Sequence, residues 1–357
     1  MPFTDSSLCK EAAMIRPFRT NVIPVVILLL TATQALAAAP ETLKWRDLVN
    51  RPERWPSETT VKNDLQFSKS TLSKETPVKV FEVKANGVDL IAPEGFIFEQ
   101  SPQDCNLLED ANTFWSSLTA EQKDLDWSKI VADRTLWPDT VTLTTDVYFR
   151  QNAKIDQGEQ VPVVTVEAGQ KVVIMHPKVQ GTLRVNSTET DIFSRARELA
   201  GKPESERPGI MAAVLDGRLL DGNGQKLDAK PADYYIIYYA ASTCPRCAVF
   251  SPKFVEYYNE HFAGRNDLQV VVWSTERPKS NILKYMRDHQ MPFATLNDDD
   301  AGMVVYAFRK QGVIVNIPGF IVIDRFGREL YSTGGTGEAQ TIPTAEASLE
   351  KIAALLP

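Results

Sequence analysis

The residues best suited to chemistry are two cysteines separated by two residues, Cys244-Pro245-Arg246-Cys247. Tyr234–Ala240, a nearly unbroken apolar and aromatic run, precedes them and predicts a buried strand, and the pattern from Pro245 on predicts a helix. A thiol at the start of a helix faces unpaired backbone N–H groups and the positive end of the helix dipole, and both stabilise a thiolate. The placement therefore predicts thiol–disulfide exchange, with Cys244 as the exposed attacking thiol and Cys247 as the more buried resolving thiol.

The two residues inside the pair tune this chemistry. Pro245 suits an early helical position, because its missing N–H costs nothing there. Arg246 adds a positive charge beside the expected thiolate.

Other interpretations of the pair stay open. A zinc site needs two further ligands at similar spacing, whereas the chain beyond an N-terminal signal offers only the lone Cys105 and three scattered histidines. An inert structural disulfide is another possibility. We expect no metal and no cofactor. Cys105 is expected to be a buried spectator, with transient pairing to Cys244 as the alternative.

A second motif, Ile317-Pro318, stands just before an apolar run at Phe320–Asp324. Proline lacks a backbone donor and so marks the start of a strand. A cis bond between the two residues would turn the Ile317 backbone towards the sulfurs. Its N–H and C=O would then pair with an extended substrate segment.

Together these motifs resemble the thioredoxin superfamily, most closely its tryparedoxin and nucleoredoxin-like branch, over residues 210–357. The resemblance implies a thioredoxin fold and thiol–disulfide exchange. It also implies that Cys244 attacks, that Cys247 resolves and that Pro318 is the family's cis-proline. Pro252 matches the proline that interrupts the family's first long helix.

The sequence departs from the family's pattern at two places. Thr243 stands where the family usually has a tryptophan that shapes the surface around the thiol, which affects the choice of partner. Tyr238 stands where thioredoxin carries a buried acid, as in the tryparedoxin-like branch. Glu256 and Glu276 are the candidates to replace that acid, although each is expected to be an ordinary surface or helix carboxylate.

Residues 210–357 are expected to alternate strands and helices in an α/β sandwich with a terminal hairpin. The turn residues Asp221-Gly222-Asn223-Gly224 predict a further hairpin. Strands are predicted at Tyr234–Ala240, Leu268–Trp273, Phe320–Asp324 and Glu329–Ser332. Helices are predicted at Pro245–His261, Ser280–His289, Ala301–Lys310 and Thr344–Leu356.

The preceding chain contains a duplication. Leu43–Val49 with Trp55-Pro56 recurs as Leu125–Val131 with Trp137-Pro138, at an offset of 82 residues. We interpret residues 43–124 and 125–206 as two copies, repeat 1 and repeat 2, joined to the last domain by a polar linker at 201–209. Strands are predicted at Val78–Val83, Val88–Ile91, Val161–Val166 and Lys171–Met175, and helices near Asp110–Leu118 and Thr190–Leu199. Each copy is a small β-rich module, for which an SH3-like barrel is a candidate fold, with its tryptophans as core anchors.

The N-terminus is typical of an export signal. Arg16 and Arg19 precede the apolar run Val22–Leu30, and Ala35-Leu36-Ala37 is a small-x-small cleavage site. We expect residues 1–37 to be a signal peptide and the mature protein to be periplasmic or otherwise extracytoplasmic. An uncleaved anchor is the alternative, and only then would the protein contact a membrane.

A net charge of −7 argues against a nucleic-acid partner. The expected partners are protein thiols or disulfides and an electron-donor redox protein. The leading hypothesis is an exported thiol–disulfide oxidoreductase that reduces, rather than oxidises, protein disulfides. The alternative is a cell-envelope adaptor in which the repeats bind a partner and the last domain is mainly structural. A peroxidase is a more distant third.

Overall fold

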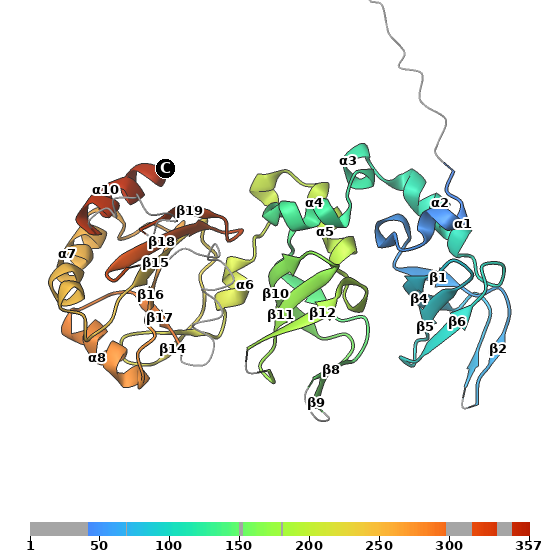
Figure 1. The fold of residues 1–357 in the computed structure, drawn as a ribbon, viewed down its shortest axis with the longest axis horizontal. Coiled ribbons are helices and arrows are strands. Elements are labelled where there is room, and N and C mark those ends of the chain that lie inside the picture. The colour runs from blue at the N-terminus through green and yellow to red at the C-terminus, as the bar shows by residue number, and fades with distance from the viewer. Residues whose placement is uncertain (1–41, 69, 150–152, 180, 298–315, 334–344) are drawn as a thin grey trace, which may run out of the picture. The chain divides into compact units, whose positions relative to one another are not determined.

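The computed structural model describes residues 42–357 except 69, 150–152, 180, 298–315 and 334–344 (Figure 1). Thr42–Pro357 forms one compact unit. The predicted signal peptide, 1–37, and the helix predicted at 301–310 lie outside the described residues. Within the described ranges, no helix combines the length and apolar character needed to cross a bilayer.

Repeat 1 holds a four-stranded antiparallel sheet in the order β1-β4-β5-β6 and a separate two-stranded hairpin, β2-β3. Alternating apolar residues of β4 and β5 point into a core closed by helix α2. The elements are α1 (Trp45–Leu48), η1 (Pro52–Arg54), β1 (Glu58–Thr60), β2 (Leu65–Gln66), β3 (Thr71–Leu72), β4 (Pro77–Val83), β5 (Val88–Ile91), β6 (Ile97–Gln100), α2 (Leu107–Ser117) and α3 (Ala120–Lys123).

Repeat 2 has the corresponding sheet, in the order β12-β11-β10-β7, and the corresponding hairpin, β8-β9. Its elements are α4 (Trp127–Ala132), η2 (Arg134–Leu136), β7 (Thr140–Thr142), β8 (Val147–Phe149), β9 (Ala153–Ile155), β10 (Gln160–Glu167), β11 (Lys171–Met175), β12 (Thr182–Asn186), η3 (Ser187–Glu189) and α5 (Ile192–Ala200).

The two repeats match in detail. Each sheet carries a bulge at the same place, between β4 and β5 in one and between β10 and β11 in the other. The Trp45 indole donates to the backbone oxygen of Lys84, and the Trp127 indole donates to that of Glu167, both at 2.9 Å. These tryptophans therefore hold equivalent positions in the two repeats. The likeness to an SH3 barrel stays a prediction.

The last domain is built on a seven-stranded mixed sheet in the order β14-β13-β17-β16-β15-β18-β19. Strands β15, β16 and β17 run parallel to one another, β18 runs antiparallel to its neighbour β15, and β19 runs antiparallel to β18. Its elements are η4 (Glu204–Glu206), α6 (Met211–Leu215), β13 (Leu219–Leu220), β14 (Lys226–Leu227), β15 (Tyr234–Tyr239), α7 (Pro245–His261), β16 (Leu268–Trp273), α8 (Lys279–Asp288), β17 (Ala294–Leu296), β18 (Gly319–Asp324), β19 (Glu329–Ser332) and α10 (Ala345–Leu355).

This order of strands, with parallel crossovers followed by an antiparallel hairpin and a terminal helix, is a thioredoxin-like fold. It agrees with the fold expected for residues 210–357. The hairpin predicted around Asp221–Gly224 is present as β13 and β14. The predicted helix Pro245–His261 has the observed bounds.

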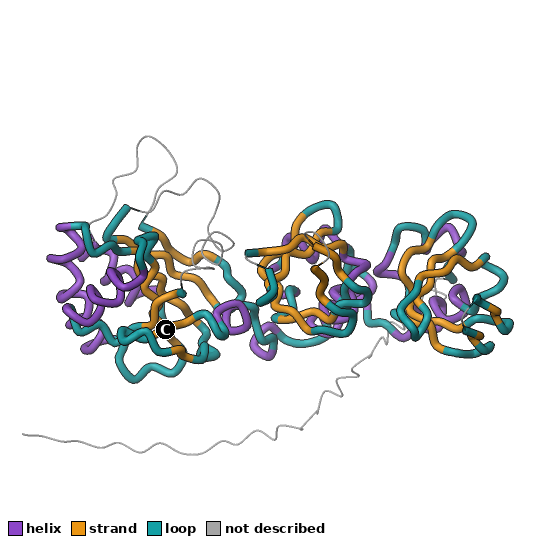
Figure 2. Tube along the Cα trace, turned by 90° about the horizontal axis from the view of Figure 1, so that it is seen from below, coloured by secondary structure: helices purple, strands orange, loops and turns teal. Residues whose placement is uncertain are grey.

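The two faces of the sheet are covered differently. Helices α7, α8 and α10 lie on one face, where Figure 2 shows helices gathered beside the strands, and Phe250, Phe254 and Phe320 pack there against the β15 residue Tyr238. On the other face, apolar residues of β15 and β18 share one core with α6 and with β10 of repeat 2. Repeat 2 and the last domain are therefore joined by buried apolar contacts.

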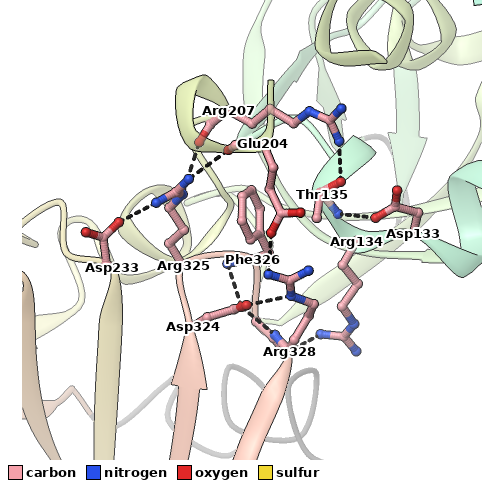
Figure 3. A network of polar contacts seen from close by, with 11 residues as sticks. Asp133, Arg134, Thr135, Glu204, Arg207, Asp233, Asp324, Arg325, Phe326 and Arg328 are labelled. Carbon is pink, nitrogen blue, oxygen red and sulfur yellow. Dashed lines mark hydrogen bonds and ion pairs between the residues drawn. The ribbon is translucent and has the colours of Figure 1, made fainter. Parts of the chain in front are cut away.

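The stretch predicted to be a linker, 201–209, is also bound by side chains on both sides (Figure 3). Arg325 donates to the backbone oxygens of Arg207, at 3.1 Å, and Glu204, at 2.8 Å, and pairs with Asp233. The guanidinium of Arg207 in turn donates to the Thr135 hydroxyl of repeat 2.

The turn between β18 and β19 belongs to the same network (Figure 3). Arg328 pairs with the buried Asp324 at 2.5 Å and with Glu204 at 2.6 Å. Arg134 of η2 donates to the backbone oxygen of Gly327 at 2.6 Å. The connecting stretch therefore acts as a fixed joint between repeat 2 and the last domain.

Candidate active site

Cys244 lies at the corner between the buried strand β15 and helix α7. It is the N-cap residue of the helix, and Pro245 occupies the first turn, where proline is well tolerated. The Cys244 sulfur accepts a hydrogen bond from the backbone N–H of Cys247 at 3.2 Å. Cys244 is half-buried and Cys247 fully buried, and both are free thiols. The order of exposure is the one the sequence predicts.

The Ile317-Pro318 motif lies against this corner. The bond between the two residues is cis, as the sequence predicts. The Cys244 thiol donates to the backbone oxygen of Ile317, with a sulfur–oxygen distance of 3.9 Å. The structure therefore brings the sulfur pair and the cis-proline together. A second cis bond joins Arg277 and Pro278.

The surface around Cys244 combines polar and apolar exposed side chains. Thr243, Pro245 and Arg246 are exposed, and Val249, on the next turn of α7, is 67 % exposed. Arg246 supplies a positive charge within this surface. An extended partner can therefore reach the half-buried sulfur from the side of the helix start.

The environment of Cys247 keeps its thiol protonated. Burial, followed by the hydrogen bond with Cys244, raises the pKa of Cys247 to about 12. A protonated, buried second thiol does not compete with Cys244 for an incoming disulfide. This matches the part of resolving thiol.

A row of three buried hydroxyl groups lies near the sulfurs. The sequence singles out Tyr238 among them but gives no signal for Ser251 or Tyr285. The hydroxyl of Tyr238 lies 2.7 Å from that of Ser251, which lies 2.6 Å from that of Tyr285. Burial, as the largest cause, raises the pKa of Tyr238 well above its usual range and that of Tyr285 to about 12, and negative charge on either cysteine contributes to both shifts. Neutral hydroxyls therefore take the place of the buried acid of thioredoxin.

Glu276, a candidate to replace that acid, instead binds the loop before Cys244. Its carboxylate accepts hydrogen bonds from the backbone N–H of Ser242, at 2.7 Å, and from the Ser242 hydroxyl, at 2.6 Å. It thus ties the loop before Cys244 to the chain after β16. Glu256, the other candidate, is exposed on α7.

Cys105 has a structural explanation. It forms a β-bridge with Val61 in repeat 1, and Thr190 forms the corresponding bridge with Leu143 in repeat 2. Cys105 is 2 % exposed, and burial raises the pKa of its thiol. It therefore occupies a position that a buried threonine fills in the other repeat.

The described residues contain no group of three or more His, Cys, Asp or Glu side chains that could hold a metal ion.

Comparisons with known proteins find matches among solved structures, each of which covers about two-fifths of the chain or less. No protein-family model and no curated protein matches the chain. Tryparedoxin I from Crithidia fasciculata has 21 % sequence identity over 32 % of this chain and 79 % of its own, with a TM-score of 0.27. Thioredoxin from Wuchereria bancrofti has 16 % identity over 41 % and 98 %, with a TM-score of 0.31. A thiol:disulfide interchange protein from Chlorobium tepidum has 20 % identity over 38 % and 90 %, with a TM-score of 0.28. The thioredoxin-like fold of the last domain rests on its own strand order and cis-proline, and the chain is similar to thioredoxin-type structures in that part.

Proposed function

We propose that the last domain catalyses thiol–disulfide exchange and reduces disulfides of protein substrates. One observation carries the proposal: the half-buried Cys244 sulfur lies at a helix start, within reach of both the Cys247 N–H and the Ile317 carbonyl beside a cis-proline. The helix start stabilises a thiolate, and the carbonyl offers a backbone partner to an extended substrate.

The reaction proceeds in two exchanges. The Cys244 thiolate attacks one sulfur of a substrate disulfide and forms a mixed disulfide, while the other substrate sulfur leaves as a thiolate and takes up a proton. Cys247 then loses its proton and attacks the Cys244 sulfur. The Cys244–Cys247 disulfide forms, and the second substrate sulfur leaves as a thiol. Two electrons pass from the cysteine pair to the substrate.

An external dithiol protein is needed to return the pair to its reduced form by the reverse exchange. The reductive direction requires a potential nearer to that of thioredoxin, about −270 mV, than to that of a strong oxidant, about −120 mV. Arg246 and the helix start favour the thiolate and so shift the potential upward. Equilibration of the purified protein in glutathione buffers measures the potential, and a value near the oxidant's would reverse the proposed direction.

The activity is tested with a disulfide-linked peptide and dithiothreitol as the electron donor. Wild-type protein should accelerate reduction, Cys244→Ser should abolish the acceleration, and Cys105→Ser should retain it. Equal rates for wild type and Cys244→Ser would overturn the proposal. A pair that stays oxidised and unreactive would instead favour the adaptor hypothesis.

We also propose that the protein is exported with cleavage after Ala37, so that it acts outside the cytoplasm. The basic residues, the apolar run and the Ala35-Leu36-Ala37 site support this proposal. Intact-mass measurement of the exported protein tests it. A mass that includes residues 1–37 would indicate the uncleaved anchor.

A further inference from the structure

A cleft of about 310 Å³ lies between repeat 1 and repeat 2, away from any cysteine. Trp55 and Phe81 line it from repeat 1, and Phe193 and Arg197 line it from repeat 2. The volume is at the lower end of the range for small-ligand sites, which are mostly apolar with a few polar groups. The wall of this cleft is more polar than that, because hydroxyl side chains such as those of Thr144, Thr188 and Ser194 line it beside the aromatic rings.

Arg197 is an unusual residue to find in such a wall, because it is only 7 % exposed. Its Nη2 atom donates to the backbone oxygen of Glu53 at 2.5 Å, and its guanidinium lies over the ring of Phe114 at 4.6 Å. Its Nε atom is buried and has no hydrogen-bond partner. Burial also lowers the pKa of Arg197 to about 10. The side chain therefore keeps an unused donor, and the negative charge of the buried Glu53 carboxylate partly offsets the effect of burial on its pKa.

The remaining charges of the cleft favour a singly charged anion. Lys79 adds a second positive group to the wall. Of the two carboxylates there, Asp191 already pairs with Arg195 at 2.9 Å, and Glu58 is exposed. A doubly charged phosphate would be repelled by these carboxylates more strongly than a carboxylate ligand would.

We infer that the cleft binds a carboxylate joined to a small apolar group, supplied by the C-terminus of a peptide or by a free organic acid. The carboxylate pairs with the positive charge of Arg197, whose side chain lines the cleft. The apolar group lies against the rings of Trp55, Phe81 and Phe193. This site is separate from the thiol chemistry proposed for the last domain.

The test is calorimetric titration of the purified full chain with three probes: acetyl-Ala-Ala-Ala with a free carboxylate, the same peptide as its C-terminal amide, and isobutyrate. Arg197→Gln removes the guanidinium, and Ser194→Phe fills the cleft from an exposed position on its wall. Arg46→Gln, whose side chain is 80 % exposed and outside the cleft, is the matched control for lost charge. Circular dichroism verifies that each variant is folded.

The free acid should bind at least about tenfold more tightly than the amide, and both cleft variants should weaken it by about the same factor. Arg46→Gln should bind like wild type. Binding of isobutyrate as tight as that of the peptide identifies a free organic acid as sufficient, whereas binding of the peptide alone identifies a peptide C-terminus. Absence of binding up to about 20 mM of either carboxylate would overturn the inference, since this corresponds to less than about 3 kcal/mol of binding free energy. Equal binding of acid and amide, or full binding by Ser194→Phe, would also overturn it, and both results stand even when Arg197→Gln does not fold.

Discussion

The sulfur of Cys244 lies 3.9 Å from the backbone oxygen of Ile317, although the two residues are 73 positions apart in the chain. The corner between β15 and α7 supplies the sulfur, and the cis bond at the start of β18 supplies the carbonyl. Because β15 and β18 are paired neighbours in the sheet, with the end of β15 opposite the start of β18, the two groups meet at the same end of these strands. The Cys244 thiol and the Ile317 carbonyl therefore lie side by side.

Cys247→Ser should trap the substrate on the protein. The Cys244 thiolate still attacks, but no second thiol resolves the mixed disulfide. Mass spectrometry after incubation with a disulfide-linked peptide should show the protein plus one peptide, released by dithiothreitol. Cys105→Ser, which leaves both thiols of the pair, should show no accumulation. An adduct on the Cys244→Ser variant instead would contradict the assigned order of attack.

The raised pKa of Cys247 predicts how its reactivity depends on pH. With a pKa of about 12, the fraction present as thiolate is small at neutral pH and grows about tenfold for each unit up to about pH 11. The Cys244→Ser variant removes the contribution of Cys244 and keeps burial, which is the largest cause of the shift. In this variant, alkylation of Cys247 by iodoacetamide, followed by peptide mass spectrometry, should therefore keep rising between about pH 8 and 10. A plateau near pH 9, typical of an ordinary thiol, would contradict the effect of burial.

Removal of the middle hydroxyl of the buried row should destabilise the fold. Ser251→Ala leaves the hydroxyls of Tyr238 and Tyr285 without their shared partner, which should lower the free energy of unfolding by about 2–4 kcal/mol. Urea denaturation measures this change. Ser280→Ala, at an exposed position of helix α8, is the matched control and should change stability by less than about 0.5 kcal/mol. A similarly small effect of Ser251→Ala would show that the hydrogen bonds among the three hydroxyl groups contribute nothing to stability.

Loss of the Glu276 charge should slow the reaction without abolishing it. Glu276→Gln weakens the bonds to the Ser242 backbone and hydroxyl that hold the loop before Cys244. We expect kcat/KM for peptide disulfide reduction to fall by about 3–10-fold, because the position of the attacking sulfur is less well fixed. Glu256→Gln, which changes an exposed carboxylate of α7, should leave kcat/KM as it is. Equal values for both variants would refute the positioning role.

The joint between repeat 2 and the last domain can be tested at Arg325. Arg325→Ala removes the guanidinium group that donates hydrogen bonds to the backbone oxygens of Arg207 and Glu204. It also removes the ion pair with Asp233. We expect the unfolding free energy to fall by about 1–3 kcal/mol, as measured by chemical denaturation. Arg46→Ala, at an exposed position, serves as the control. An unchanged value for Arg325→Ala would mean that the network adds nothing to the stability of the joint.

The sequence was sufficient to predict the reactive corner, because its signals are local. A buried strand, a C-x-x-C pair and a proline in the first turn are neighbours in the chain, and the helix Pro245–His261 has the predicted bounds. The cis bond before Pro318 is confirmed as well. The predicted bounds of the strands Leu268–Trp273 and Glu329–Ser332 also match the structure.

What the sequence did not reveal depends on tertiary contacts. Ser251 is 13 positions from Tyr238 and 34 from Tyr285, and Glu276 is 34 from Ser242, so no local pattern links them. Strands β1 and β17 have three residues each, which is too short to show a period of two. The equivalence of Cys105 and Thr190 appears only in their β-bridges, because the two residues lie 85 positions apart, three more than the 82-residue offset.

The apolar core that β10, α6 and the sheet share has a consequence for handling the protein. The stretch 201–209 is rich in proline and glycine and looks like a suitable place to separate the last domain from repeat 2. A last domain produced without repeat 2 would, however, lose the apolar residues of β10 that cover one face of its sheet. Tyr235, Ile237 and Ile323, which are buried in the full chain, would then form part of a solvent-exposed apolar surface. Tests of the proposed thiol–disulfide exchange therefore call for the whole of Thr42–Pro357 rather than the last domain alone.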